Sequence, residues 1–378
     1  MKSFITEFNL KYVFYSSLFV FTLIAFGYLR ENSYGSTPGS RLELIHADVS
    51  RGVVENDIPL RILEGNVHAR QDSLEIFCQR AIYNELEKIL NLSGNVRMYR
   101  GKDTLLAAEA RYFEASKIAI AEGDVKIFRP RQTMRSDFME YHYNTDKILA
   151  TGNLYMNDQE NSVSVTAKKG EYLPESGLSY VQEEAHLWRI DTTSSDTVHI
   201  YGEKMEYHFT DQRKAIARDS VKIKQGKLIA FCDSAIYLID EDLIYLKSNP
   251  RALQENNKMI GKEMQMVLVD QEIREIHVQG NAEAISIVDT FFQKENKLEG
   301  REIVMYIEDR QLSEIHAISN ARSYYHLKEN EESKGINVAS ADTIKAFIVK
   351  NELDSIAVIG GAQGTYYPQD YKGKIVRE

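Results

Sequence analysis

A glycine followed by Asn or Asp recurs at a constant interval in the first half of the chain. Gly65, Gly94, Gly123 and Gly152 are spaced 29 residues apart, and each precedes Asn or Asp. Sequence periods of about 20–50 residues are typical of repeat proteins, in which each unit buries its apolar face by packing on its neighbours. The chain is therefore expected to form a stack of similar units.

Side chains alternate between apolar and polar on both sides of each glycine. Val96 and Met98 follow the second glycine by two and four residues, and Ile148 and Ala150 precede the fourth by four and two. This period of two predicts a strand with one buried face. A two-residue hairpin would need an apolar residue directly before the glycine, but that position is polar. The glycine is therefore predicted to be an inward position without a side chain, at which one continuous strand bends.

Polar loops are expected upstream of each bend. Tyr83, Tyr112 and Tyr141 each precede a glycine by eleven residues, and polar segments such as NELEK (84–88) and NTDK (144–147) follow these tyrosines. Asn, Asp and similar residues at strand junctions favour turns. Each unit is predicted to be a strand, a polar hairpin loop, a long bent strand and a connector of variable length.

The bend recurs ten times in this alignment, although later copies lose the glycine. The ten positions are Gly65, Gly94, Gly123, Gly152, Glu183, Asp219, Ser248, Gly280, Ser319 and Gly360. Ten two-strand units predict an all-β, elongated, solenoid-like stack of about twenty strands. No internal domain boundary and no helix beyond the N-terminal segment are expected.

An uncharged apolar segment, residues 12–29, precedes the repeats. Its length lies between that of a signal-peptide core and a minimal membrane span. Three interpretations remain open: an uncleaved transmembrane anchor, a cleaved signal and a buried core helix. The predicted organisation is an N-terminal hydrophobic helix serving as membrane anchor or signal (1–30), a linker (31–41), the repeat domain (42–367) and a C-terminal tail (368–378).

Charge and motif content argue against several classes of function. The chain carries 46 basic and 56 acidic residues, and this net charge of −10 disfavours nucleic acid as a partner. We recognise no catalytic motif, phosphate-binding loop or metal-ligand spacing, so no enzyme activity, catalytic residue, metal or cofactor is expected. The basic segment RPRQTMR (129–135) is interpreted as a solvated connector, with an anion site as the alternative. Cys78 and Cys232 occupy equivalent positions in two units that are five units apart. In a stack, their Cα atoms would be too far apart for a disulfide.

An apolar interior is the remaining candidate for a functional site. The inward-facing apolar residues have two interpretations: a closed and filled core, or an open groove whose walls hold lipid acyl chains. The predicted lining residues are Val67, Tyr83, Val96, Met98, Tyr112, Val125, Ile127, Tyr141, Leu154, Met156, Tyr172, Leu187, Tyr207, Val221, Ile223 and Tyr237.

Three segments carry a family resemblance. AIYNELEKILNLSGNVRMY (81–99), ARYFEASKIAIAEGDVKIF (110–128) and MEYHYNTDKILATGNLYM (139–156) resemble the OstA-like family of lipopolysaccharide transport proteins. The resemblance extends over about residues 42–364. It implies an open, twisted β-jellyroll, periplasmic like other jellyrolls of this transport system, in which lipid A tails occupy the apolar interior and ATP is hydrolysed by a separate protein.

The resemblance also implies a set of partners. These are lipopolysaccharide through its lipid A, other jellyroll proteins of a transport bridge, an inner-membrane ABC transporter and an outer-membrane translocon. Residues 12–29 would tether the protein to the inner membrane, or would be cleaved to give a soluble periplasmic protein. Edge strands near 44–54 and 356–367 would pair with neighbouring jellyrolls. The alternatives are a structural or adhesion β-solenoid with a closed core and, third, a β-helical polysaccharide lyase.

Overall fold

The structure is a computed structural model that describes residues 41–159, 162–189, 197–210, 212–289, 294–329, 332–350, 352–373 and 375. The predicted N-terminal helix and most of the predicted linker lie outside these residues. Among the residues described, no helix is long and apolar enough to cross a membrane. Residues 40–378 cluster into one compact unit.

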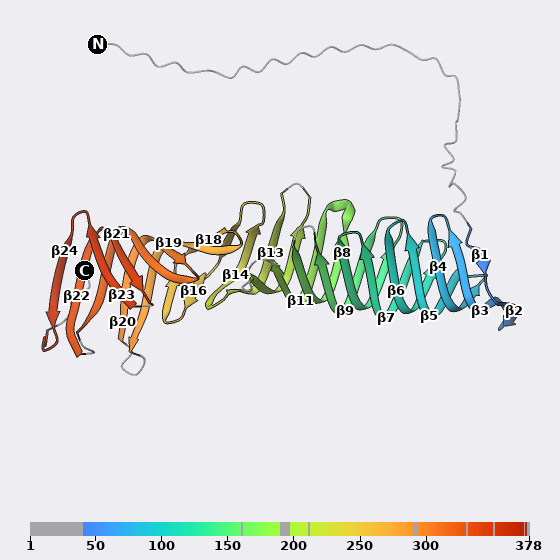
Figure 1. The fold of residues 1–378 in the computed structure, drawn as a ribbon, viewed down its shortest axis with the longest axis horizontal. Helices are drawn as coiled ribbons and strands as arrows, with labels where there is room; N and C mark the ends of the chain where they lie inside the picture. Colours follow the sequence, from blue (N-terminus) through green and yellow to red (C-terminus); the bar gives the residue numbers. More distant parts are fainter. Residues whose placement is uncertain are drawn as a thin grey trace, which may run out of the picture. The chain divides into compact units, whose positions relative to one another are not determined.

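The described residues form one antiparallel sheet of 24 strands, in which chain neighbours are mostly sheet neighbours (Figure 1). The first twelve strands are β1 (Glu43–His46), β2 (Val49–Glu55), β3 (Ile58–Gln71), β4 (Leu74–Asn84), β5 (Ile89–Arg100), β6 (Asp103–Phe113), β7 (Ile118–Arg129), β8 (Gln132–His142), β9 (Lys147–Asp158), β10 (Val163–Leu173), β11 (Leu178–Arg189) and β12 (His199–His208). The others are β13 (Lys214–Gln225), β14 (Leu228–Leu238), β15 (Leu243–Lys247), β16 (Arg251–Gln254), β17 (Asn257–Ile260), β18 (Glu263–Val269), β19 (Glu272–Asp289), β20 (Lys294–Glu308), β21 (Gln311–Glu329), β22 (Glu332–Val349), β23 (Glu352–Ile359) and β24 (Gln363–Pro368). One 3-10 turn, η1 (Pro174–Ser176), joins β10 to β11. The prediction of an all-β repeat stack is confirmed.

All ten predicted bends coincide with two consecutive residues of positive φ, which we call the corners. The pairs are Gly65/Asn66, Gly94/Asn95, Gly123/Asp124, Gly152/Asn153, Glu183/Glu184, Asp219/Ser220, Ser248/Asn249, Gly280/Asn281, Ser319/Asn320 and Gly360/Gly361. In β5 the pairing register shifts between Ser93 and Val96, so the strand carries a β-bulge there. Bulges bend the strand that contains them, so the glycine marks a bend and not a hairpin turn.

The predicted inward orientation of the corner glycines is wrong. A Cβ built on Gly94 would meet the Gln79 side chain at 2.8 Å, and one on Gly152 would meet Asp137 at 2.4 Å. Gln79 and Asp137 are exposed, so the missing side chain would point to the outside of the bend. The apolar phase of β5 still continues past Gly94, because two left-handed residues in succession bring Val96 back to the interior.

The polar loops connect strands as predicted. The loop of residues 85–88 joins β4 to β5, and the equivalent loops at 114–117 and 143–146 join β6 to β7 and β8 to β9. At their other ends the strands are joined by two-residue turns such as 72–73 and 101–102. Each corner therefore lies midway between a polar loop and a short turn, and the repeat has two walls that meet at the corner.

Both cysteines lie on the inner face next to a corner. Cys78 and Cys232 are free and buried. Burial raises the pKa of the Cys78 thiol to about 11 and that of the Cys232 thiol to about 12. Neither thiol is ionised at neutral pH, which fits a packing role.

Candidate functional site

The predicted lining residues all belong to, or pack against, one continuous apolar cluster. Twelve are at most 3 % exposed: Val67, Val96, Met98, Tyr112, Val125, Ile127, Tyr141, Leu154, Leu187, Val221, Ile223 and Tyr237. The remaining four are half-buried: Tyr83, Met156, Tyr172 and Tyr207. Between β3 and β14 the interior is therefore packed with the protein's own side chains, apart from one small cavity lined by β8 to β12.

A row of polar side chains lies where the turns and the polar loops meet, a line that we call the mouth. These residues follow the first residue of each corner by six positions, in the same phase as the apolar interior. We call them the clasp row, and its members are Gln71, Arg100, Arg129, Asp158, Arg189, Gln225 and Gln254. Sequence reasoning missed this row, although a polar residue recurring in an inward phase could have identified it.

The first clasp is uncharged. The Tyr112 hydroxyl donates to Gln71 Oε1 at 2.6 Å, and Gln71 Nε2 donates to the carbonyl of Glu114 at 3.3 Å. Beside it, Lys117 Nζ lies 2.5 Å from Asp72 Oδ2. These contacts join the turn at 72–73 to the loop at 114–117, so the two edges of the mouth touch here.

The second and third clasps share one tyrosine hydroxyl. Arg100 Nη2 lies 3.0 Å and Arg129 Nη2 3.1 Å from the Tyr141 hydroxyl oxygen. Arg100 also binds Asp146 and the carbonyl of Tyr143, and Arg129 Nε lies 3.2 Å from Asp103 Oδ2. The predicted solvated connector at 129–135 is therefore wrong for Arg129, whose side chain is 12 % exposed.

Further clasps close the mouth along the next units. Arg189 Nη1 donates to the Tyr237 hydroxyl and to Asp242, both at 3.0 Å. Gln225 bridges the backbone of the next loop, accepting from the Ile273 amide at 2.9 Å. Gln254 Nε2 donates to the carbonyl of Arg310 at 3.1 Å. The mouth is thus held shut by side-chain contacts, whereas the corner is continuous backbone.

Beyond the clasp row the interior widens into a cavity of about 810 Å³ near the C-terminal end. Apolar side chains from β20 to β23 line it, among them Leu298, Ile315, Ala339, Ile344 and Leu353. Here the positions equivalent to the clasps are Ser286 and Tyr325, which also line the cavity. A volume of 300–1,000 Å³ is typical of sites that take small-molecule ligands.

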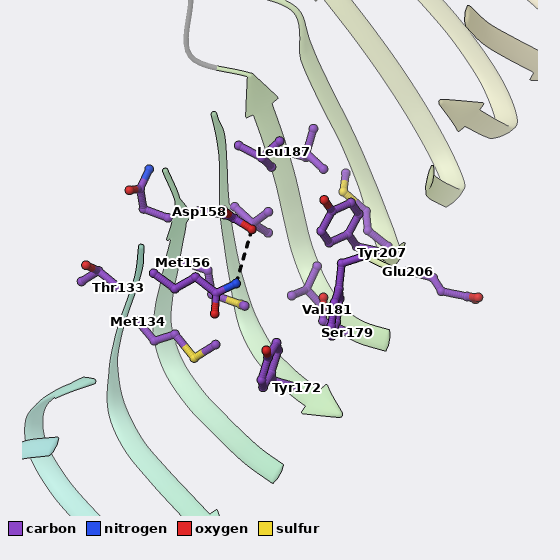
Figure 2. Close-up of a pocket in the computed structure, with 16 residues that line it drawn as sticks. Thr133, Met134, Met156, Asp158, Tyr172, Ser179, Val181, Leu187, Glu206 and Tyr207 are labelled. Atoms are coloured by element: carbon purple, nitrogen blue, oxygen red, sulfur yellow. Dashed lines mark hydrogen bonds between the residues drawn. The ribbon is translucent and has the colours of Figure 1, made fainter. Parts of the chain in front are cut away.

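A smaller cavity of about 50 Å³ lies in the middle of the interior (Figure 2). Met134, Met156, Tyr172 and Leu187 line it, and Asp158 lies at its rim, hydrogen-bonded to Gln132 at 3.4 Å. Tyr207 also faces it, and burial, followed by the charge of Asp158, raises the pKa of Tyr207 to about 12. The Tyr207 hydroxyl and Arg189 Nε are buried and make no hydrogen bond within the described part of the chain.

Both ends of the stack present edge strands. At the N-terminal end, β3 is the one described strand that β1 and β2 pair with, and Leu44, Ile45 and Val54 are exposed. At the C-terminal end, β23 and β24 pair with β22 and with no other strand that the structure describes, and Ile359 and Tyr366 are exposed. Such edges can pair with strands of another chain.

Ionisable side chains elsewhere form local pairs. Four histidines of the loop-side wall contact the glutamate two residues earlier, as in His142–Glu140 at 2.5 Å and His277–Glu275 at 2.7 Å. No group of three or more His, Cys, Asp or Glu within the described ranges could hold a metal ion.

Bent antiparallel strands around an apolar interior, with a mouth on one side, define a β-jellyroll stack. Comparison with known proteins makes the class more specific for part of the chain: residues 39–193 match a family model described as OstA-like protein. The resemblance found in the sequence is confirmed for these residues. No curated protein matches the chain.

A solved structure similar to this one is LptH from Pseudomonas aeruginosa, described as the LptA-homologous periplasmic component of the lipopolysaccharide transport device. The match has 13 % sequence identity and a TM-score of 0.21, and it covers 39 % of this chain and 82 % of LptH.

Proposed function

We propose that the protein is a non-enzymatic periplasmic carrier of lipopolysaccharide, which holds the acyl chains of lipid A between its two walls. The match of residues 39–193 to the OstA-like family supports this proposal. The observation that carries it is one apolar cluster of side chains, extending from Leu63 to Ala346. Beside this cluster the mouth is bridged by side chains from Gln71 to Gln254.

A filled interior is compatible with this role on energetic grounds. A hydrogen bond contributes about 0.5–1.5 kcal/mol net, or about 1.5–3 kcal/mol when one partner is charged. Burial of an acyl chain contributes about 0.8 kcal/mol per methylene. Ten methylenes therefore offset the opening of one clasp, and the flexible side chains of Met98, Met134 and Met156 can repack around the guest.

Photo-crosslinking in cells tests the carrier function. A crosslinking amino acid at Met98, Ile127, Met156 or Ile223 is expected to capture lipopolysaccharide, because these side chains point into the interior. A matched control at Lys126, which points outward beside Ile127, is expected to capture none. Absence of adducts at all four interior positions, with a positive control in another lipid carrier, would contradict the proposal.

The competing function is a structural or adhesion solenoid with a permanently closed core. The very low exposure of the twelve buried lining residues favours it. It predicts that the four interior positions stay inaccessible to lipid and to water-borne probes alike, so the crosslinking experiment separates the two functions.

We further propose that the carrier is one member of a bridge between the two membranes. Residues 12–29 would hold it at the inner membrane beside an ABC transporter, and edge strands would pair with other jellyrolls and with an outer-membrane translocon. The exposed apolar side chains of β1, β2, β23 and β24 support edge pairing.

Deletion of residues 356–378 is expected to abolish end-to-end association without unfolding the remaining units. The deletion removes β24 and the second half of β23, which among the described strands pair with β22 alone. The units of a stack depend mainly on their nearest neighbours. A pull-down with a tagged partner jellyroll measures association, and circular dichroism of the same preparation reports folding. Association that persists in the folded deletion variant would exclude this edge as the docking site.

A further inference from the structure

The charges in the clasp row are concentrated in its middle. Gln71 lies at one end and Gln225 and Gln254 at the other, whereas three arginines and one aspartate lie between them: Arg100, Arg129, Asp158 and Arg189. Glutamine is sufficient to close the mouth, because Gln71 and Gln225 both bridge it. The three guanidinium groups therefore need an explanation beyond closure.

The acidic partners of these arginines are easier to displace than the arginines. The Arg100 side chain is 22 % exposed and its partner Asp146 is 46 % exposed. The Arg189 side chain is 21 % exposed and its partner Asp242 is 36 % exposed. Asp103 is also more exposed than Arg129, at 22 % against 12 %. An anion arriving from solvent can take the place of the carboxylate while the guanidinium stays at the mouth.

Two hydrogen-bond donors at the same part of the mouth have no acceptor. Arg189 Nε and the Tyr207 hydroxyl are buried without a partner within the described residues, and the Tyr207 ring lines the cavity of about 50 Å³. An unsatisfied buried donor costs about 1–3 kcal/mol. Both groups can be satisfied by a ligand that brings oxygen acceptors.

We propose that Arg100, Arg129 and Arg189 form a binding site for the phosphate groups of an amphiphile's headgroup, and that phosphate binding opens the mouth. This inference rests on the proposed function. A phosphate offers several acceptor oxygens and a charge of about −1.5 to −2, and it fits the planar guanidinium fork. It replaces Asp146 on Arg100, Asp242 on Arg189 or the Tyr141 hydroxyl on Arg129. The contact to the opposite edge then breaks, and the acyl chains enter between the walls.

The test compares two lipids that differ only in phosphate. Full-length protein in detergent is titrated with fluorescent lipid A carrying two phosphates and with the same lipid after dephosphorylation. Wild-type protein is expected to bind the phosphorylated lipid more tightly. Arg129→Gln and Arg189→Gln are each expected to weaken that binding about tenfold, the equivalent of about 1.4 kcal/mol, and to leave binding of the dephosphorylated lipid within about twofold.

Matched variants keep the test interpretable. Gln225→Ala removes an uncharged clasp and is expected to leave the preference for phosphate unchanged. Arg129→Lys keeps the charge and is expected to restore part of the affinity, which shows that a folding defect is not responsible. Equal losses for both lipids, or no loss in either arginine variant, would overturn the phosphate site. If the wild-type protein binds neither lipid, the carrier function itself is refuted; equal binding of both refutes only the phosphate site.

Discussion

Ala339→Trp is expected to weaken lipopolysaccharide binding at least tenfold while the protein stays folded. Ala339 is 9 % exposed and lines the cavity of about 810 Å³ near the C-terminal end. An indole at this position occupies space that the acyl chains would otherwise fill. Loss of only two buried methylenes, at about 0.8 kcal/mol each, already corresponds to about tenfold in affinity. The measurement is lipid titration together with a thermal melt.

The neighbouring residue supplies the control. Ser340 follows Ala339 in β22 and points to the other side of the sheet, so Ser340→Trp adds the same bulk outside the cavity. It is expected to leave both affinity and melting temperature almost unchanged. Equal lipid affinity in the two tryptophan variants would show that acyl chains do not enter the C-terminal cavity.

Gly152→Ala is expected to lower the free energy of unfolding by about 2–3 kcal/mol. Gly152 has φ +81°, and a left-handed conformation costs a residue with a Cβ roughly 1–2 kcal/mol. The new Cβ would also lie 2.4 Å from Asp137 Oδ2 and 2.9 Å from Asp137 Cβ, so Asp137 must move away. Urea unfolding followed by circular dichroism measures the change.

A later corner provides the reverse substitution. Ser319 adopts φ +62° at the position equivalent to the glycine, and Ser319→Gly relieves this strain. It is expected to leave stability unchanged or to raise it by up to about 1 kcal/mol, since glycine also gains freedom in the unfolded chain. A stability loss as large as that of Gly152→Ala would show that corner conformation does not determine stability.

The bends were predictable from sequence because period-two alternation survives where the glycine is lost. At Glu183 and Asp219 the alternation of apolar and polar residues alone predicts a bend, and both residues lie at corners with positive φ. The outward orientation of Gly94 and Gly152 was not predictable in the same way. It depends on two consecutive left-handed residues opposing one residue of the next strand, which the alternation does not specify.

The side-chain contacts across the mouth could not be predicted from the sequence pattern. The basic cluster at 129–135 contained the relevant residue, Arg129, but its partners Tyr141 and Asp103 lie 12 and 26 residues away. The contacts between loops and turns depend on the distance between the two walls, which the alternation does not specify. The C-terminal cavity was unpredictable for the same reason: Ser286 and Tyr325, at the positions equivalent to the clasps, line it.

The spacing of the clasps has a consequence for movement along the stack. Apart from Arg129, which reaches Tyr141 only 12 residues away, each of the clasps described above links a turn to a residue 41–56 positions further on. Strand pairing continues through the corners independently of these contacts. One clasp can therefore release while those before and after it stay formed. A bulky guest could advance as a local swelling, with the protein resealing behind it, and the strand ladder would remain intact during the passage.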